Sequence, residues 1–180
     1  GRFLDVESFP MWLRLSLGEI LMLLPAGLYL AVTRTNPFSF IPFKLLSPVT
    51  VLLLVVFAYC MMPLIACVNA ASMLFQQNAV STMMVQLIDY PLPLTILFIA
   101  VVPALCEEFI FRGALYQTFR KEKIWGAVFL SALLFGIMHL NFNQFCYAFV
   151  MGIFFALLLE ATGSILAPMI VHFTYNANSA

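Results

Sequence analysis

The sequence contains very little charge. Aspartate, glutamate, lysine and arginine make up 9% of its 180 residues, whereas 64% are hydrophobic. A water-soluble domain carries roughly 25% charged residues, because its surface must face water. So few charges cannot cover a water-facing surface, and we therefore expect a multi-pass membrane protein.

Two further shortages narrow the possible functions. Eight basic and eight acidic residues give a net charge of zero, so no basic surface indicates a nucleic-acid partner. The four cysteines lie in apolar runs without a CxxC pair or the spacing of a disulfide framework. We expect them to be buried, inert thiols.

Long apolar runs, separated by short polar or proline-rich segments, make up most of the chain. Because a helix needs about 20 residues to cross a bilayer, these runs predict about six spans. Their approximate limits are 13–32, 49–71, 91–119, 124–140, 145–159 and 165–176. No repeat or linker divides the chain. The predicted fold is all-α, a polytopic membrane helical bundle forming one integral membrane domain over residues 1–180.

The polar segments between the runs add two expectations. Residues 76–89 mix polar and apolar side chains, which predicts a short helix at the membrane surface. Arg14 and Glu19 lie in the first turns of the first span, where they could pair or extend toward the headgroups. Five of the eight basic residues fall on one side of the predicted spans, the cytoplasmic side by the positive-inside rule: Arg34, Lys44, Arg120, Lys121 and Lys123.

Two adjacent carboxylates, Glu107 and Glu108, lie inside the third apolar run. A charged side chain near the bilayer centre costs about 2.5–3.5 kcal/mol on insertion scales, so each needs a partner or a task. Glu108 and Arg112 have the i,i+4 spacing of a helical ion pair. Glu107 points about 100° away, so we do not expect the two carboxylates to face one partner. Pro103 predicts a local kink that would open a wet cavity beside Glu107.

Three later polar residues, His139, His172 and Asn176, also lie in apolar surroundings, and the last two share a helix face. Two chemistries fit this set. Glu107 could act as a general base for water with His139, while His172 and Asn176 stabilise an oxyanion. Alternatively, Glu107, His139 and His172 could hold a metal ion such as zinc; asparagine is a poor zinc ligand, which favours the first chemistry.

Three motifs in order, Glu107-Glu108-x-x-x-Arg112, Phe135-x-x-x-His139 and His172-x-x-x-Asn176, resemble those of the CPBP intramembrane proteases. This is the CAAX-protease and bacteriocin-processing family, also called the Abi or type II CAAX prenyl endopeptidase family. The resemblance covers about residues 91–176, and it indicates a catalytic motif region at 91–180. Family members commonly have about eight spans, so a chain with six would be a shortened form or a fragment.

The resemblance implies an intramembrane endopeptidase that hydrolyses a peptide bond of a membrane-associated protein or peptide. It implies a catalytic glutamate, Glu107, and a water-activating helper, His139. It assigns His172 and Asn176 to the oxyanion hole, with Glu108 and Arg112 in support. A glutamate-dependent mechanism needs no cofactor, although the family is often described as metalloproteases and a divalent metal stays open. The expected surroundings are a bacterial cell membrane.

Other functions are compatible with parts of the pattern. The chain could be a non-catalytic bacteriocin-immunity or membrane scaffold protein, a role linked to parts of the same family. Glu107 could instead relay protons in a transporter. Cys106 could be a thiol nucleophile, although its place next to Glu107 on the helix points it elsewhere.

Overall fold

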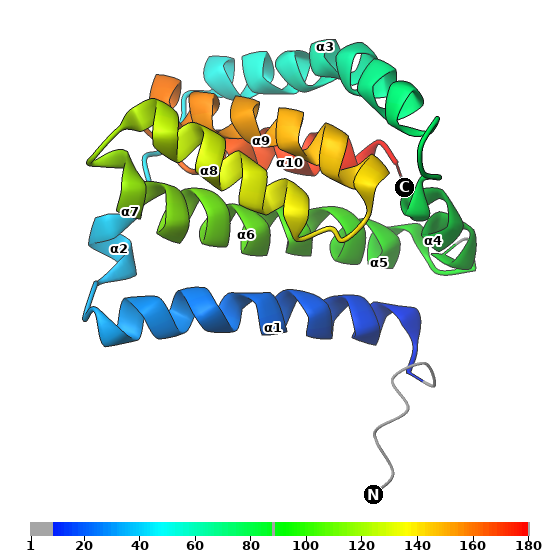
Figure 1. The fold of residues 1–180 in the computed structure, drawn as a ribbon, viewed down its shortest axis with the longest axis horizontal. Coiled ribbons are helices and arrows are strands. Elements are labelled where there is room, and N and C mark those ends of the chain that lie inside the picture. The colour runs from blue at the N-terminus through cyan, green and yellow to red at the C-terminus, as the bar shows by residue number, and fades with distance from the viewer. Residues whose placement is uncertain (1–8, 88, 180) are drawn as a thin grey trace, which may run out of the picture.

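The computed structural model describes residues 9–87 and 89–179, and every regular element within these ranges is a helix (Figure 1). The predicted domain runs from 1 to 180, so its residues 1–8, 88 and 180 lie outside the described part. In chain order the elements are α1 (Met11–Val32), α2 (Pro37–Phe40), α3 (Pro48–Ser72), α4 (Ala79–Leu87), α5 (Leu92–Ile96), η2 (Leu97–Val101), α6 (Val102–Glu108), η3 (Phe109–Leu115), α7 (Tyr116–Arg120), α8 (Ile124–Ile137), α9 (Phe142–Thr162) and α10 (Leu166–Ala177). The all-α prediction is confirmed.

Five consecutive elements, α5 to α7, form one continuous helix over Leu92–Arg120, which we call the motif helix. It begins after Pro91 with Pro93 in its first turn, where a missing N–H breaks no helical bond. Two segments of this helix, η2 and η3, are π-helical. The predicted third span, 91–119, therefore matches a single rod with local irregularities.

The bounds of the helices differ from the predicted spans mainly at the fourth and fifth spans. α8 ends at Ile137, so His139 lies in the turn that follows rather than inside the helix. α9 begins earlier than predicted, because the Asn141 side chain caps it by accepting a hydrogen bond from the Gln144 backbone. It ends at Gly163, whose φ of 65° suits glycine. The polar residues 141–144 therefore start a helix instead of breaking one.

Figure 1 shows how the helices are arranged around the motif helix. α1 lies along one side of it and contacts α6 and both π-helical segments. α8, α9 and α10 pack together on the other side, and α3 arches over them. The predicted surface segment 76–89 contains the short helix α4. The motif helix is thus enclosed between α1 and the α8–α10 layer.

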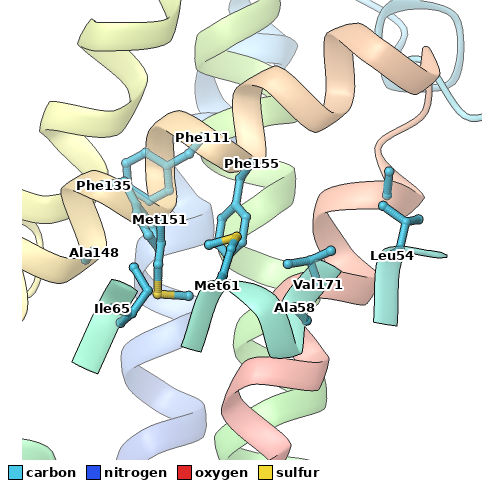
Figure 2. Close-up of a cluster of buried hydrophobic side chains, with 11 residues drawn as sticks. Leu54, Ala58, Met61, Ile65, Phe111, Phe135, Ala148, Met151, Phe155 and Val171 are labelled. Atoms are coloured by element: carbon cyan, nitrogen blue, oxygen red, sulfur yellow. The ribbon is translucent and has the colours of Figure 1, made fainter. Parts of the chain in front are cut away.

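The main apolar core lies where α3, α8, α9 and α10 meet the motif helix (Figure 2). It contains large buried side chains from several helices, namely Leu54, Met61, Ile65, Phe111, Phe135, Met151, Phe155 and Val171. By contrast, α1 buries only Ala26 and Leu30 among its residues, and half of its eight leucines are exposed. Exposed apolar surface of this kind suits a lipid environment, where burial of leucine brings little gain.

Four helices in the described part are long and apolar enough to cross a membrane: α1, α3, the motif helix and α9. α8 and α10 complete six rods, but their 14 and 12 residues make them shorter than those four. At 1.5 Å per residue they reach roughly 20 Å, less than the thickness of the hydrocarbon core. His139, in the turn after α8, and Asn176, near the end of α10, therefore lie at the ends of the two shorter rods.

The predicted group of five basic residues lies at one end of the bundle, where α1, the motif helix and α9 end (Figure 1). The contacts agree: Ser164 donates a hydrogen bond to the Lys44 carbonyl at 2.6 Å, and Lys121 lies over the Phe40 ring. Lys44 and Ser164 are 120 residues apart in sequence. These contacts join the segment around α2 and Lys44 to the residues that follow α9 and the motif helix.

Candidate active site

Both carboxylates of the motif helix are buried, at the end of α6 between the two π-helical segments. Glu107 is 7% exposed and Glu108 is fully buried at 0%. Pro103 stands in the first turn of α6, directly after η2, and has no N–H to give to the preceding turn. Where the sequence predicts a kink, the structure has a π-helical segment that ends just before Pro103. Such π-helical segments frequently occur at functional sites.

Arg112 confirms the predicted i,i+4 pair and makes a further contact. Its Nη1 donates to Glu108 Oε1 at 3.1 Å, with both side chains fully buried. Its Nη2 donates to the Gly152 carbonyl on α9 at 3.0 Å. The guanidinium lies over the Phe135 and Phe155 rings, with Cζ 4.4 and 5.0 Å from their centroids. Arg112 is thus fixed by two hydrogen bonds and two aromatic faces.

His172 contacts both carboxylates, contrary to the expectation that they would not face one partner. Its Nδ1 is 3.0 Å from Glu108 Oε1, and its Nε2 is 3.7 Å from Glu107 Oε2. The two glutamates do diverge around the helix. An imidazole has a nitrogen on each side, however, so a ring placed between them by α10 reaches one with each nitrogen. Because a carboxylate can only accept, Nδ1 carries a hydrogen toward Glu108.

The four predicted catalytic residues line one cavity of about 420 Å³: Glu107, His139, His172 and Asn176. They come from the motif helix, the turn after α8, and α10. The predicted convergence of these elements is therefore present in the structure. The cavity has room for several water molecules.

The orientation of His139 is set by its own helix. Its Nδ1 lies 2.8 Å from the Phe135 carbonyl oxygen, which can only accept, so Nδ1 donates. In the neutral ring this leaves Nε2 as a hydrogen-bond acceptor. Phe135 packs edge-on against His139 and His172, with centroids 5.2 and 5.9 Å away. The Phe135 ring therefore packs against both imidazoles.

Three residues of the site were missed at the sequence level. Gly152 offers its carbonyl to Arg112, and Phe155 stacks on His172 with centroids 5.0 Å apart. Both sit in an apolar helix where no pattern distinguishes them from packing residues. Glu19 lines the cavity instead of pairing with Arg14. Arg14 and Glu19 are five positions apart on α1, which places them on different faces of that helix.

The alternative chemistry would place a metal ion between Glu107, His139 and His172. In the described residues, no group of three or more His, Cys, Asp or Glu side chains lies close enough to hold a metal ion. Glu108 and the Phe135 carbonyl oxygen bind the Nδ1 atoms of His172 and His139, so only the Nε2 atoms of these rings remain to face water or another ligand. Cys106 is half-buried and is not among the residues found to line the cavity, so the thiol alternative gains no support.

Two glycines, Gly113 and Gly136, lie where neighbouring segments approach closely. A Cβ at Gly113 would come within 2.9 Å of an Ile41 side-chain atom. A Cβ at Gly136 would meet the Phe145 ring at 2.9 Å and its carbonyl oxygen at 3.0 Å. Both glycines therefore permit the close approach of elements that enclose the site.

Comparisons with known proteins match the same region of the chain. The profile of the family described as type II CAAX prenyl endopeptidase Rce1-like matches residues 89–178. The chain is 29% identical over 108 residues to the membrane-embedded CAAX protease MroQ of Staphylococcus aureus (strain USA300), covering 56% of this chain and 44% of that protein. It is 34% identical over 88 residues to the putative membrane peptidase YdiL of Bacillus subtilis (strain 168), covering 47% and 35%.

The chain thus spans less than half the length of these relatives, and no solved structure matches it. The relatives are bacterial and are named as membrane proteins, and four described helices are long and apolar enough to cross a bilayer. The chain is a multi-pass integral membrane protein. Since the matched residues 89–178 hold all three motifs, it belongs to the Rce1-like family of type II CAAX prenyl endopeptidases.

Proposed function

We propose that this chain carries the catalytic centre of a membrane-embedded endopeptidase in which Glu107 activates water. The observation that carries the proposal is the convergence of Glu107, His139, His172 and Asn176 on one cavity. They come from three separate parts of an otherwise apolar bundle. A shared position for four polar groups, each expensive to bury, supports a common task.

Water activation is the role of Glu107 and His139. Glu107 lines the cavity, and His139 has its Nε2 free to accept because Nδ1 is bonded to the Phe135 carbonyl. A water between them would lose a proton to Glu107 as its oxygen attacks the peptide carbonyl carbon. The same carboxyl group would then give that proton to the leaving amine nitrogen. Both proton transfers are thus carried by one residue.

Stabilisation of the oxyanion is the role of His172 and Asn176. They lie one turn apart on α10 and both line the cavity. The Asn176 amide supplies N–H donors, and a hydrogen on His172 Nε2 would supply another. Donation from Nε2 requires the doubly protonated ring, since Nδ1 already donates to Glu108. The carboxylates of Glu107 and Glu108 lie on either side of that ring.

Glu108 and Arg112 support the site without lining the cavity. Arg112 holds Glu108 Oε1, and the same oxygen accepts from His172 Nδ1. The pair therefore fixes the ring that faces Glu107. This arrangement parallels the carboxylate that orients the histidine of a catalytic triad.

The substrate we propose is a membrane-associated peptide or protein. The name of the S. aureus relative describes a membrane-embedded CAAX protease, and that of the B. subtilis relative a putative membrane peptidase. The cavity lies within a bundle whose outer helices are apolar enough to contact lipid. A substrate segment would therefore reach Glu107 from within or beside the bilayer.

The test is substitution of Glu107 in purified protein with a peptidase assay. Glu107→Gln should abolish cleavage, because an amide cannot take the proton from water. Glu160→Gln makes the same change at the charged end of the bundle and should leave cleavage intact. Retained cleavage in Glu107→Gln would contradict the proposal. Loss of activity with a chelator, restored by zinc, would contradict the metal-free mechanism.

A further inference from the structure

The cavity also has a polar wall that is built by the last turn of α3. Asn69, in that turn, lines the same cavity as the catalytic residues we propose. This wall adjoins the turn that carries His139, because Gln76, in the segment after α3, accepts a hydrogen bond from the Phe142 backbone N–H at 2.7 Å. Asn69 lies outside residues 89–178, so the family match assigns it no role.

Hydrogen bonds hold the side-chain amide of Asn69 in one orientation. Its Oδ1 accepts from Asn143 Nδ2 at 2.9 Å and from Asn78 Nδ2 at 3.0 Å. Asn143 is fully buried at the start of α9, and its Nδ2 also contacts the Asn69 carbonyl oxygen and Ser72 Oγ, at 3.0 and 2.8 Å. A reversed Asn69 amide would set its NH2 group against two other NH2 groups. Oδ1 therefore faces these partners.

The donor side of the same amide remains for a ligand. Asn69 Nδ2 carries two hydrogens, and within the described residues its hydrogen-bond partner is Met73 Sδ, a weak acceptor 3.7 Å away. At least one N–H is therefore left over. Because Asn69 lines the cavity, an acceptor bound there can take this hydrogen.

A peptide is the ligand that would bring such an acceptor into an apolar bundle. A segment that enters the cavity exchanges water for protein around its backbone, and each carbonyl left without a donor costs free energy. His172 and Asn176 are the donors proposed for the carbonyl that is cleaved. Other carbonyls of the segment need further donors, and Asn69 offers one that is oriented before the peptide arrives.

We propose that Asn69 is a substrate-binding residue whose Nδ2 donates a hydrogen bond to a main-chain carbonyl of the bound peptide, other than the carbonyl that is cleaved. This inference rests on the proposed function, because it takes the cavity to be the peptide site. Asn143 is the positioning residue that fixes the Asn69 amide from α9. The contact lies away from the reacting atoms and is the same before and during the reaction, so it should act on KM rather than on kcat.

Peptide binding to Glu107→Gln tests this contact without cleavage. The probe is a fluorescently labelled leucine–alanine peptide in detergent, and fluorescence anisotropy measures its Kd. Glu107→Gln/Asn69→Asp keeps the accepting oxygen but loses the donor, so we expect a Kd roughly three- to tenfold higher. The matched control, Glu107→Gln/Asn36→Asp, should bind like Glu107→Gln. Asn36 caps α2, is not among the residues found to line the cavity, and can be replaced as a cap by aspartate.

A second variant and a change in the peptide separate a direct contact from a structural effect. Asn69→Ala introduces no charge and should raise Kd as Asn69→Asp does, so the test stands on either variant that unfolds at the temperature of Glu107→Gln. Replacing one peptide amide at a time by an alkene removes one carbonyl acceptor. At one position this should weaken binding to Glu107→Gln roughly three- to tenfold, without weakening it further in the Asn69 variants.

The possible results distinguish this inference from the proposed function. Failure of the peptide to bind Glu107→Gln, equal Kd values with and without Asn69, or the lack of such a position in the peptide would overturn the inference. Binding that depends on Asn69, in a protein that cleaves no peptide, would count against the proposed function alone. In the protein that retains Glu107, Asn69→Ala should raise KM by the same factor and leave kcat within about twofold.

Discussion

In the described part of the chain, two arginine–glutamate pairs have the same chemistry and opposite surroundings. In the first, Arg112 and Glu108 are both fully buried and are further bonded to Gly152 and His172. In the second, at the charged end, the side chains of Arg120 and Glu160 are 46% and 21% exposed. Tyr116 donates to Glu160 at 2.8 Å, so this pair also joins the motif helix to α9.

The two pairs differ in whether water can solvate one charged group after its partner has been removed. At the charged end, water can solvate the remaining group, so the attraction is weak and screened. Around Glu108 no water can do so, and an unpaired charge would stay in apolar surroundings. The buried pair is therefore obligatory for the structure, whereas the exposed pair adds little to it. The catalytic residues we propose adjoin the obligatory pair.

The largest expected effect comes from breaking the buried pair. Arg112→Leu leaves the Glu108 charge uncompensated and should lower the free energy of unfolding by about 3–5 kcal/mol. Thermal or denaturant unfolding in detergent measures it. The double variant Glu108→Leu/Arg112→Leu removes both charges and should be more stable than Arg112→Leu alone. A single variant within about 1 kcal/mol of the unmodified protein would show that the pair is not obligatory.

A second prediction concerns the chemical role of the same pair. Glu108→Gln keeps the shape but removes the charge that faces His172 Nδ1, 3.0 Å away. We expect kcat to fall roughly 10–100-fold, because a charge-assisted hydrogen bond contributes about 1.5–3 kcal/mol. Peptidase kinetics measure this fall. Glu160→Gln, which changes the exposed pair in the same way, should leave kcat unaltered; equal effects would remove the distinction between the pairs.

The third prediction tests how tightly the buried pair is enclosed. A Cβ at Gly152 would lie 2.9 Å from the Ala132 Cα and 3.1 Å from Arg112 Nη2. Gly152→Ala should therefore destabilise the protein by about 1–3 kcal/mol through overpacking. The control is Gly126→Ala on α8, where the nearest atom would be 3.5 Å away and alanine favours the helix. Unfolding of Gly152→Ala at the same temperature as the control would contradict this prediction.

The sequence was most informative about elements whose pattern is local. Apolar runs predicted the helices, and i,i+4 spacing predicted both the Glu108–Arg112 pair and the shared face of His172 and Asn176. The order of the three motifs then predicted that Glu107, His139, His172 and Asn176 meet, and they line one cavity. Each of these follows from helix geometry or from a resemblance carried by several residues.

Contacts between distant helices were beyond the sequence. Gly152 and Phe155 meet Arg112 only because α9 crosses the motif helix at that point, and nothing in their own segment indicates it. His172 lies between two carboxylates because α10 enters at that angle. Glu19 was considered with Arg14, its neighbour in sequence, while in the structure it lines the same cavity as Glu107 on the motif helix. Local spacing cannot choose among partners on other helices.

The smallest expected effect completes the comparison of the two pairs. Arg120→Gln removes the exposed pair, and the free energy of unfolding should fall by no more than about 1 kcal/mol, because Arg120 is nearly half exposed. Added salt should reduce even this difference by screening the pair in the unmodified protein. Unfolding at low and high salt measures both effects, and kcat should stay the same. If the free energy of unfolding fell as much as in Arg112→Leu, the charged end would also be sheltered from water. Burial within the bundle would then not explain the difference between the two pairs.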